Sequence, residues 1–152
     1  SFARLSRMEY AILADPVMRR AAAPLIERLA DQGEAGRKAL MQILEAEIAT
    51  RAQWAVQQPV IRAVRRGLAR LGPAAAPSLP RIEQLFAMGN NPLANAAQEA
   101  DEWRICMARM GKPIDDLPFP RNYKPEMIER EKAQIRKRLE EFDPAWESGY
   151  SY

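Results

Sequence analysis

The sequence predicts an all-α protein, and three observations carry that prediction. Apolar residues recur at spacings of three and four along most of the 152-residue chain, as in amphipathic helices. Gly72-Pro73 and Asn91-Pro92 stand where one helical pattern ends and another begins. No segment alternates apolar and polar residues as a half-buried strand does. Because helix, tight turn and helix in succession is the unit of stacked helical repeats, we expect a short α-solenoid of about six or seven helices.

Two helices are predicted before Gly33. The first covers 2–13, where apolar residues fall near helical spacing. Asp15-Pro16 has the form of an N-cap followed by proline at the first helical position, so the second helix runs from Pro16 to about Asp31. Pro24 lies inside this second helix and predicts either a kink or a restart at Ala22.

The third and fourth helices are expected over residues 34–56 and 59–71. The longer one is predicted from its apolar residues Leu40, Ile43, Leu44, Ile48 and Trp54 or Ala55. The shorter one has the cleanest pattern, a narrow stripe of Ile61, Val64, Leu68 and Leu71. Its opposite side holds four arginines, which we call the arginine face and expect to be solvent-exposed: Arg62, Arg65, Arg66 and Arg70.

The fifth helix is predicted from Ala74 or Pro77 to Gly89, and the sixth from Asn91-Pro92 to Met110. Residues 112–124 are rich in proline and predict a stiff, extended connector. A final helix follows over 125–142, with apolar residues Ile128, Ile135, Leu139 and Phe142. We therefore divide the chain into a helical-repeat domain (1–111), the connector (112–124), a C-terminal helix (125–142) and an aromatic tail (143–152).

Residues 59–89 resemble a HEAT-type repeat. The resemblance rests on these features: Val60 and Arg62 at the start, Leu71-Gly72-Pro73 at the end of the first helix, and Ala75-Ala76-Pro77 leading into Leu79, Ile82 and Leu85. Residues 22–29 are similar to the second half of such a repeat, and 91–111 are similar to the first helix of a following one, so the resemblance covers roughly 16–111. It implies a curved stack of helix pairs and, by the habit of the family, a binding role.

The composition argues against an enzyme. The chain has no histidine, which removes the commonest general base and metal ligand. The single cysteine, Cys106, has apolar neighbours typical of a core thiol. Asp115-Asp116 is interpreted as a turn, and no glycine-rich phosphate loop or nucleophile motif is present. We therefore predict no catalytic residues, no cofactor and no metal.

The compartment is predicted with one alternative open. No apolar run is long enough for a transmembrane helix, and one cysteine permits no internal disulfide. These features are compatible with the cytoplasm, which is our expectation. The chain begins at Ser1 instead of methionine, so a removed signal or anchor stays open.

The candidate partner-binding residues are the arginine face, Phe119 and Trp146. The arginine face has two interpretations. It grips phosphates or an acidic partner, or it is the solvated face of an amphipathic helix, with acids of a neighbouring helix available for pairing at Glu99, Asp101 and Glu102. Phe119 lies between two prolines and either pins the connector to the helical body or anchors a partner. Trp146 belongs to the aromatic tail.

The function predicted from these features is a non-enzymatic protein–protein interaction module, an adaptor or a subunit of a larger assembly. The alternative is nucleic-acid binding through the arginine face, since the net charge is +3 and the pI is about 9.2. The C-terminal helix is expected to cap the helical stack, which leaves a monomer in isolation; a coiled-coil seam is the other interpretation.

Overall fold

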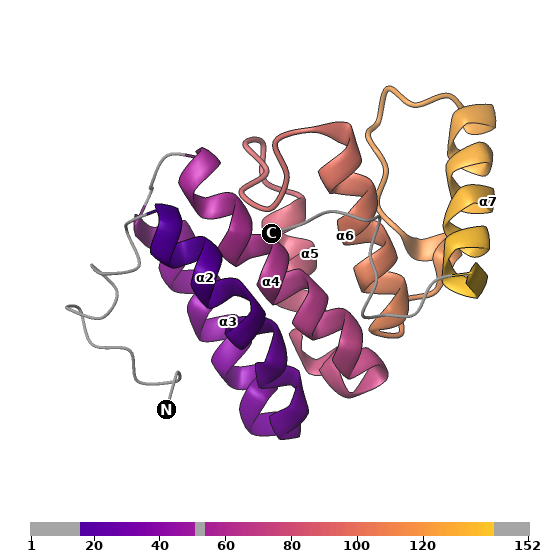
Figure 1. Ribbon diagram of the computed structural model, residues 1–152. Helices are drawn as coiled ribbons and strands as arrows, with labels where there is room; N and C mark the ends of the chain where they lie inside the picture. The colour runs from indigo at the N-terminus through magenta and orange to yellow at the C-terminus, as the bar shows by residue number, and fades with distance from the viewer. Residues whose placement is uncertain (1–15, 51–53, 142–152) are drawn as a thin grey trace.

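The structure of the chain is a computed structural model, which describes residues 16–50 and 54–141. Within those ranges every regular element is helical and no strand occurs, which confirms the all-α class. The elements, shown in Figure 1, are α2 (Pro16–Glu27), α3 (Gly33–Thr50), α4 (Trp54–Leu71), α5 (Leu79–Phe86), α6 (Ala97–Arg109) and α7 (Pro125–Glu141), with 3₁₀ segments at Arg28–Gln32, Gly72–Ser78 and Ile114–Asp116. The helix predicted over 2–13 and the aromatic tail lie outside the described residues.

The helix predicted over 34–56 is wrong in extent. In the structure α3 ends at Thr50 and α4 already begins at Trp54, ahead of the start expected at Pro59. Because α3 and α4 pack side by side, the chain must reverse between them. No glycine or proline marks that reversal in the sequence, and an apolar spacing alone does not reveal it.

Other boundaries differ by a few residues. α2 continues through Pro24 without restarting, and its last part, expected to reach Asp31, is 3₁₀ helix. α6 begins at Ala97, not at Pro92, since the amide of Leu93 donates to the side chain of Asn91 (3.0 Å) and holds that segment in a turn. α7 begins at Pro125 as predicted, where the fixed φ of proline suits the first helical position.

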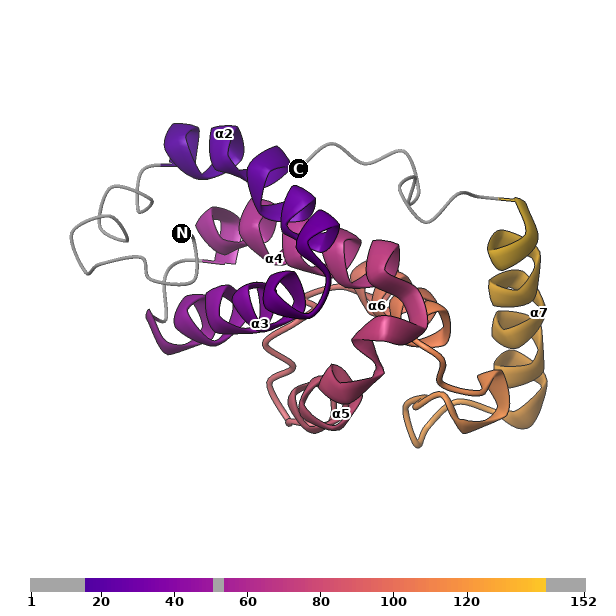
Figure 2. The same cartoon turned by 90° about the horizontal axis from the view of Figure 1, so that it is seen from below.

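α4 is the central helix. It packs against α2 and α3 and also against α6, and Ala63, Val64 and Leu68 on it are fully buried. Figure 2 shows α2 on one side of α4 and α3 and α5 on the other. The helix ends where predicted, at Gly72, whose φ of 60° is the left-handed conformation that glycine adopts at low cost.

α6 carries the second half of the core and links α4 to the C-terminal helix. Trp103, Ile105 and Met107 are buried, and the Trp103 indole donates to the carbonyl of Leu93 (2.9 Å). α7 packs on α6 at the end of the molecule, away from α2, α3 and α4 (Figures 1 and 2). Ile135 is buried there and Leu139 packs against the same core, which agrees with the interpretation of α7 as a capping helix.

Candidate functional site

The arginine face is tied into the interior of the protein. Arg62 donates to Glu99 Oε1 through Nε and Nη2 (2.9 and 2.6 Å), and Arg65 donates to Glu99 Oε2 through Nη1 (2.7 Å). The Arg65 side chain is entirely buried. Burial by itself would raise the pKa of Glu99, but the hydrogen bonds and charges of Arg62 and Arg65 outweigh it and lower the pKa. These two arginines join α4 to α6.

The other two arginines of the face are also enclosed or paired. Arg70 contacts Glu27 (3.4 Å) and Asp31 (3.1 Å), which joins α4 to α2 and the turn after it. Arg66 is only 9% exposed. The prediction that this face is solvent-exposed is therefore wrong. The sequence shows which side of α4 is apolar, but α2 and α6 flank the helix and cover its polar side as well.

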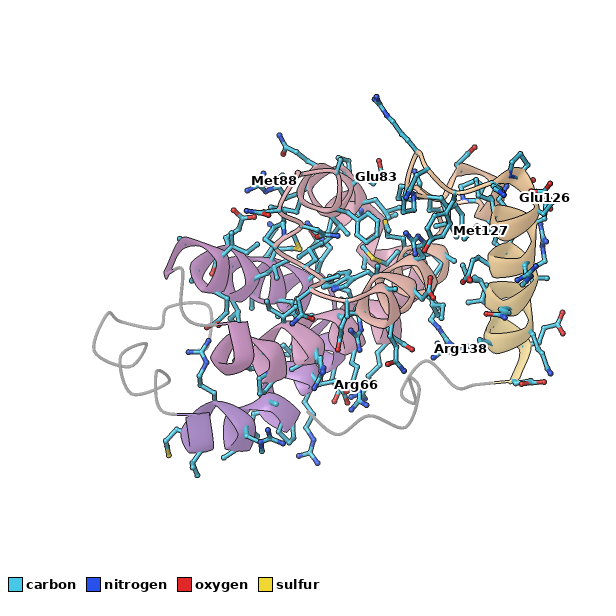
Figure 3. The ribbon with its side chains drawn as sticks, turned by 90° about the horizontal axis from the view of Figure 1, so that it is seen from above. Arg66, Glu83, Met88, Glu126, Met127 and Arg138 are labelled. Atoms are coloured by element: carbon cyan, nitrogen blue, oxygen red, sulfur yellow. The ribbon has the colours of Figure 1, made fainter. Side chains whose placement is uncertain are left out.

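Further arginine–carboxylate pairs join the remaining helices. Arg19 of α2 pairs with Glu47 of α3, and both side chains are buried. Arg138 of α7 donates to both oxygens of Glu102 on α6 (2.6 and 3.1 Å), and Figure 3 shows Arg138 extending from α7 toward α6. Glu99 and Glu102 are therefore the partners of arginines from two different helices. The interpretation of the acids as structural partners of the arginine face holds for Glu99.

Arg104 holds the connector to the helical body. Its guanidinium lies over the rings of Phe86 and Phe119, 5.3 and 4.6 Å from their centroids. In the plane of the guanidinium, Nε donates to the carbonyl of Pro118 (2.7 Å) and Nη1 to Asp101 (2.7 Å). Phe119 thus pins the connector, one of the two alternatives left open by the sequence. Trp146, the last candidate residue, lies outside the described residues.

The remaining polar residues considered in the sequence, Cys106 and Asp115, make contacts within the fold. Cys106 is buried and its Sγ lies 3.3 Å from the carbonyl oxygen of Arg65. Asp115 contacts Lys132 (3.5 Å) and Arg136 (3.6 Å) of α7, in the turn expected there. In residues 16–50 and 54–141 no three histidine, cysteine, aspartate or glutamate side chains gather as a metal site. The described helices include none that is long and apolar enough to cross a membrane.

The structure adds a groove that sequence reasoning missed. It lies between α3 and the chain from the Gly72–Ser78 segment into α5, has a volume of about 440 Å³, and is open to solvent. Its surface is mainly apolar, and it is lined by Arg37, Met41, Gln42, Glu45, Pro77, Ser78 and Arg81. We call it the α3–α5 groove. No local pattern in the sequence marks it, because its walls come from segments more than thirty residues apart.

Two arginine–carboxylate forks form the rim of this groove. Arg37 pairs with Glu34 through Nε and Nη2, and its Nη1 donates to Ser78 (2.9 Å). Arg81 donates to the two oxygens of Glu45 (2.7 and 3.0 Å). The hydrogen bonds that Arg37 donates to Glu34 and that Arg81 donates to Glu45 raise the pKa of each arginine. The rim is therefore charged, preorganised and close to electrically balanced.

Large apolar side chains are also exposed outside the groove. Val17, Met18 and Leu25 are exposed on α2, Met88 lies just after α5, and Met127 is on α7. Figure 3 shows Met88 and Met127 at separate places on the molecule. Exposed apolar side chains that stand apart, as Met88 and Met127 do, are common on protein surfaces. The α3–α5 groove combines apolar surface with ordered polar groups, and we therefore take it as the stronger candidate site.

Comparison of the chain with protein-family models, with curated proteins and with solved structures gave no match. The function is therefore argued from the geometry of this chain.

Proposed function

We propose that this chain is a non-enzymatic protein–protein interaction module, an adaptor or subunit of a larger assembly, built as a short α-solenoid with HEAT-like helix pairs. One observation carries the proposal: the α3–α5 groove joins an apolar lining to a rim of fixed hydrogen-bonding groups. In binding sites that combine apolar surface with a few polar groups, the ligand buries its apolar surface and the polar groups fix the orientation of the ligand. The partner is another protein, and the chain by itself is a monomer.

Nucleic-acid binding through the arginine face receives less support. Binding to phosphates requires cations that can leave their own partners and meet the backbone. Arg62, Arg65 and Arg70 are instead engaged with Glu99, Glu27 and Asp31. To release Arg65 for a phosphate would also remove one of the two counter-ions of the largely buried Glu99, which is costly.

The experiment is site-specific photocrosslinking from the groove. A photoreactive phenylalanine derivative replaces Gln42, an exposed residue that lines the groove, and in a matched control it replaces Gln134, an exposed residue on α7. In extracts of the source cells, the residue-42 variant should form a discrete crosslinked species that excess unlabelled wild-type chain competes away. The residue-134 variant should not form it. The same species from both positions, or none from position 42, would contradict the proposal.

A further inference from the structure

The chain shows within its own core how it recognises an aromatic ring with arginine. The guanidinium of Arg104 donates in its plane to Pro118 and Asp101, and its Cζ lies over the rings of Phe86 and Phe119. Once the edge of a guanidinium is occupied by acceptors, the flat faces remain, and they attract the electron-rich face of an aromatic ring.

At the α3–α5 groove, the edge of the Arg81 guanidinium is also occupied by hydrogen-bond acceptors. Arg81 donates to Glu45 through Nε and Nη2 and to Gln84 through Nη1 (2.8 Å). Its side chain is 42% exposed, whereas that of Arg104 is 3% exposed. Among the described residues no aromatic ring lies over Arg81. The guanidinium of Arg81 is thus held in place with its faces available to a ligand.

The groove beside Arg81 offers matching apolar surface. Met41 packs partly against the core and Pro77 is exposed, and both line the groove. A thioether makes favourable contacts with aromatic rings, and a ring also buries more apolar area than an aliphatic side chain. The chemistry of the lining therefore suits an aromatic side chain.

The charges of the rim disfavour an anionic ligand. Glu45 occupies the donor edge of Arg81, and Glu34 occupies that of Arg37. A carboxylate or phosphate entering the groove would meet those two carboxylates and find the best donors already used. A ring meets the positive guanidinium with the negative face of its quadrupole and displaces neither partner.

From this combination we infer that the α3–α5 groove binds an aromatic side chain of a partner peptide, stacked on the guanidinium of Arg81 and packed against Met41 and Pro77. The inference rests on the proposed interaction function and specifies the ligand class of that site. The partner is consequently a peptide segment that presents tryptophan, tyrosine or phenylalanine. Acidic residues in that segment are not the main determinant of its binding to the groove.

The test is peptide selection on the full-length chain. A phage library of random linear twelve-residue peptides is selected on the wild-type protein and counterselected on Arg81→Gln. Selected peptides should share an aromatic residue, and its replacement by leucine should weaken binding roughly tenfold, as expected from the loss of ring stacking and area. Lys137→Gln, a change to a 72%-exposed cation on α7, is the matched control and should bind all peptides like wild type.

Arg81→Lys separates stacking from simple charge attraction. It keeps the positive charge but lacks the planar group, so aromatic peptides should bind about fivefold more weakly. In a protein labelled with ¹³C at the methionine methyls, the Met41 signal should move upfield when an aromatic peptide binds, because the methyl group lies over the ring. A leucine-substituted peptide should not produce that shift.

The outcomes distinguish this inference from the proposed function. The selected peptides could instead share an aliphatic or acidic residue and bind Arg81→Lys as tightly as the wild-type protein. That result would overturn the assignment of an aromatic ligand but would leave the proposed interaction function in place. If counterselection on Arg81→Gln leaves no peptide that binds the wild-type protein, the groove is removed from both proposals. If deletion of residues 143–152, which include Trp146, strengthens aromatic-peptide binding several-fold, the tail of this chain occupies the groove, and the assignment to a partner is overturned.

Discussion

Glu99 on α6 accepts hydrogen bonds from Arg65 on α4, and the Arg65 side chain has no exposure to solvent. The same carboxylate also receives Arg62. A single acid is therefore shared by two cations at the junction between the N-terminal helices and the C-terminal half of the protein. Removal of that acid would leave a buried guanidinium without its main counter-ion, which costs far more than the loss of a surface pair.

Glu99→Gln should strongly destabilise the fold. We expect the free energy of unfolding to fall by about 3–5 kcal/mol, the range for a broken buried ion pair. Denaturation by urea, followed by circular dichroism, measures it. Glu140→Gln, at an exposed position on α7, is the matched control and should change stability by less than about 0.5 kcal/mol. A Glu99→Gln protein as stable as the control would show that the junction does not depend on this charge.

The contribution of Glu99 should depend on pH in a defined direction. Its pKa is lower in the folded chain than the ordinary value of 4.5, so the folded state binds this proton more weakly than the unfolded state. The stabilisation is therefore complete above pH 4.5 and is lost as the pH falls toward the folded pKa. The difference in unfolding free energy between wild type and Glu99→Gln should accordingly shrink on acidification from pH 6 to pH 3. A constant difference over that range would be inconsistent with the lowered pKa.

Glu131 on α7 should behave in the opposite way. Burial and then the charge of Asp101 raise its pKa above the ordinary value of 4.5, against smaller opposing effects of Arg104 and Arg130. The contribution of Glu131 to stability is then most favourable below pH 4.5 and decreases as the pH rises through its folded pKa, because ionisation is disfavoured in the folded state. Glu131→Gln mimics the neutral acid, so it should raise the free energy of unfolding at pH 7 by about a few tenths of a kcal/mol at this partly exposed site. It should not raise it at pH 4. An equal gain at both pH values would point to packing instead.

Gly67→Ala tests the close packing of α4. An added Cβ would lie 2.8 Å from Leu40 Cδ1 and 3.3 Å from the carbonyl oxygen of Glu27. Alanine is the better helix former by up to about 1 kcal/mol, but overpacking a tight core costs about 1–3 kcal/mol. We expect net destabilisation of roughly 1 kcal/mol in thermal unfolding. The control is Gly89→Ala, where nothing lies within 4 Å of the added atom; a stabilised Gly67→Ala protein would show that Leu40 moves aside freely.

Reversal of Arg62, Arg66 and Arg70 to glutamate should unfold the protein. The change would place new carboxylates against Glu99 and Glu27, which in the wild-type protein pair with Arg62 and Arg70. It would also place a negative charge at the largely buried position 66. The circular dichroism spectrum should lose its helical signal. Reversal of Arg121, Arg130 and Lys137, three exposed cations, changes the net charge equally and should leave the spectrum intact. If the triple variant at positions 62, 66 and 70 folds, the original prediction that the arginine face is solvent-exposed is correct after all.

Much of the secondary structure was predictable because it depends on local chemistry. The apolar stripe of α4 was correctly assigned: Ile61, Val64 and Leu68 are buried. Gly72 ends that helix and Pro125 begins α7 for conformational reasons that reside in single residues. The break between α3 and α4 was missed because residues 51–53 contain no glycine or proline to mark it.

The sites were less predictable, because a contact depends on where other helices lie. The role of Phe119 was narrowed to two alternatives by its flanking prolines, and the position of Arg104 over its ring decided between them. The exposure of Arg65 could not be judged from α4 alone, because the residue lies on the polar side of the helix and its partner Glu99 comes from α6, more than thirty residues away. No pattern in the sequence indicated the α3–α5 groove, because its lining residues come from two distant segments.

The sequence by itself determined that this protein is helical, which residues of each helix are apolar, and some of the helix ends, such as the end of α4 and the start of α7. These properties follow from backbone conformation and from the periodicity of side chains along one segment. Only the tertiary structure decided which polar residues become internal. Burial of Arg65 is tolerated because Glu99 reaches it from another helix and supplies its charge, and such compensation between distant segments is a property of their packing.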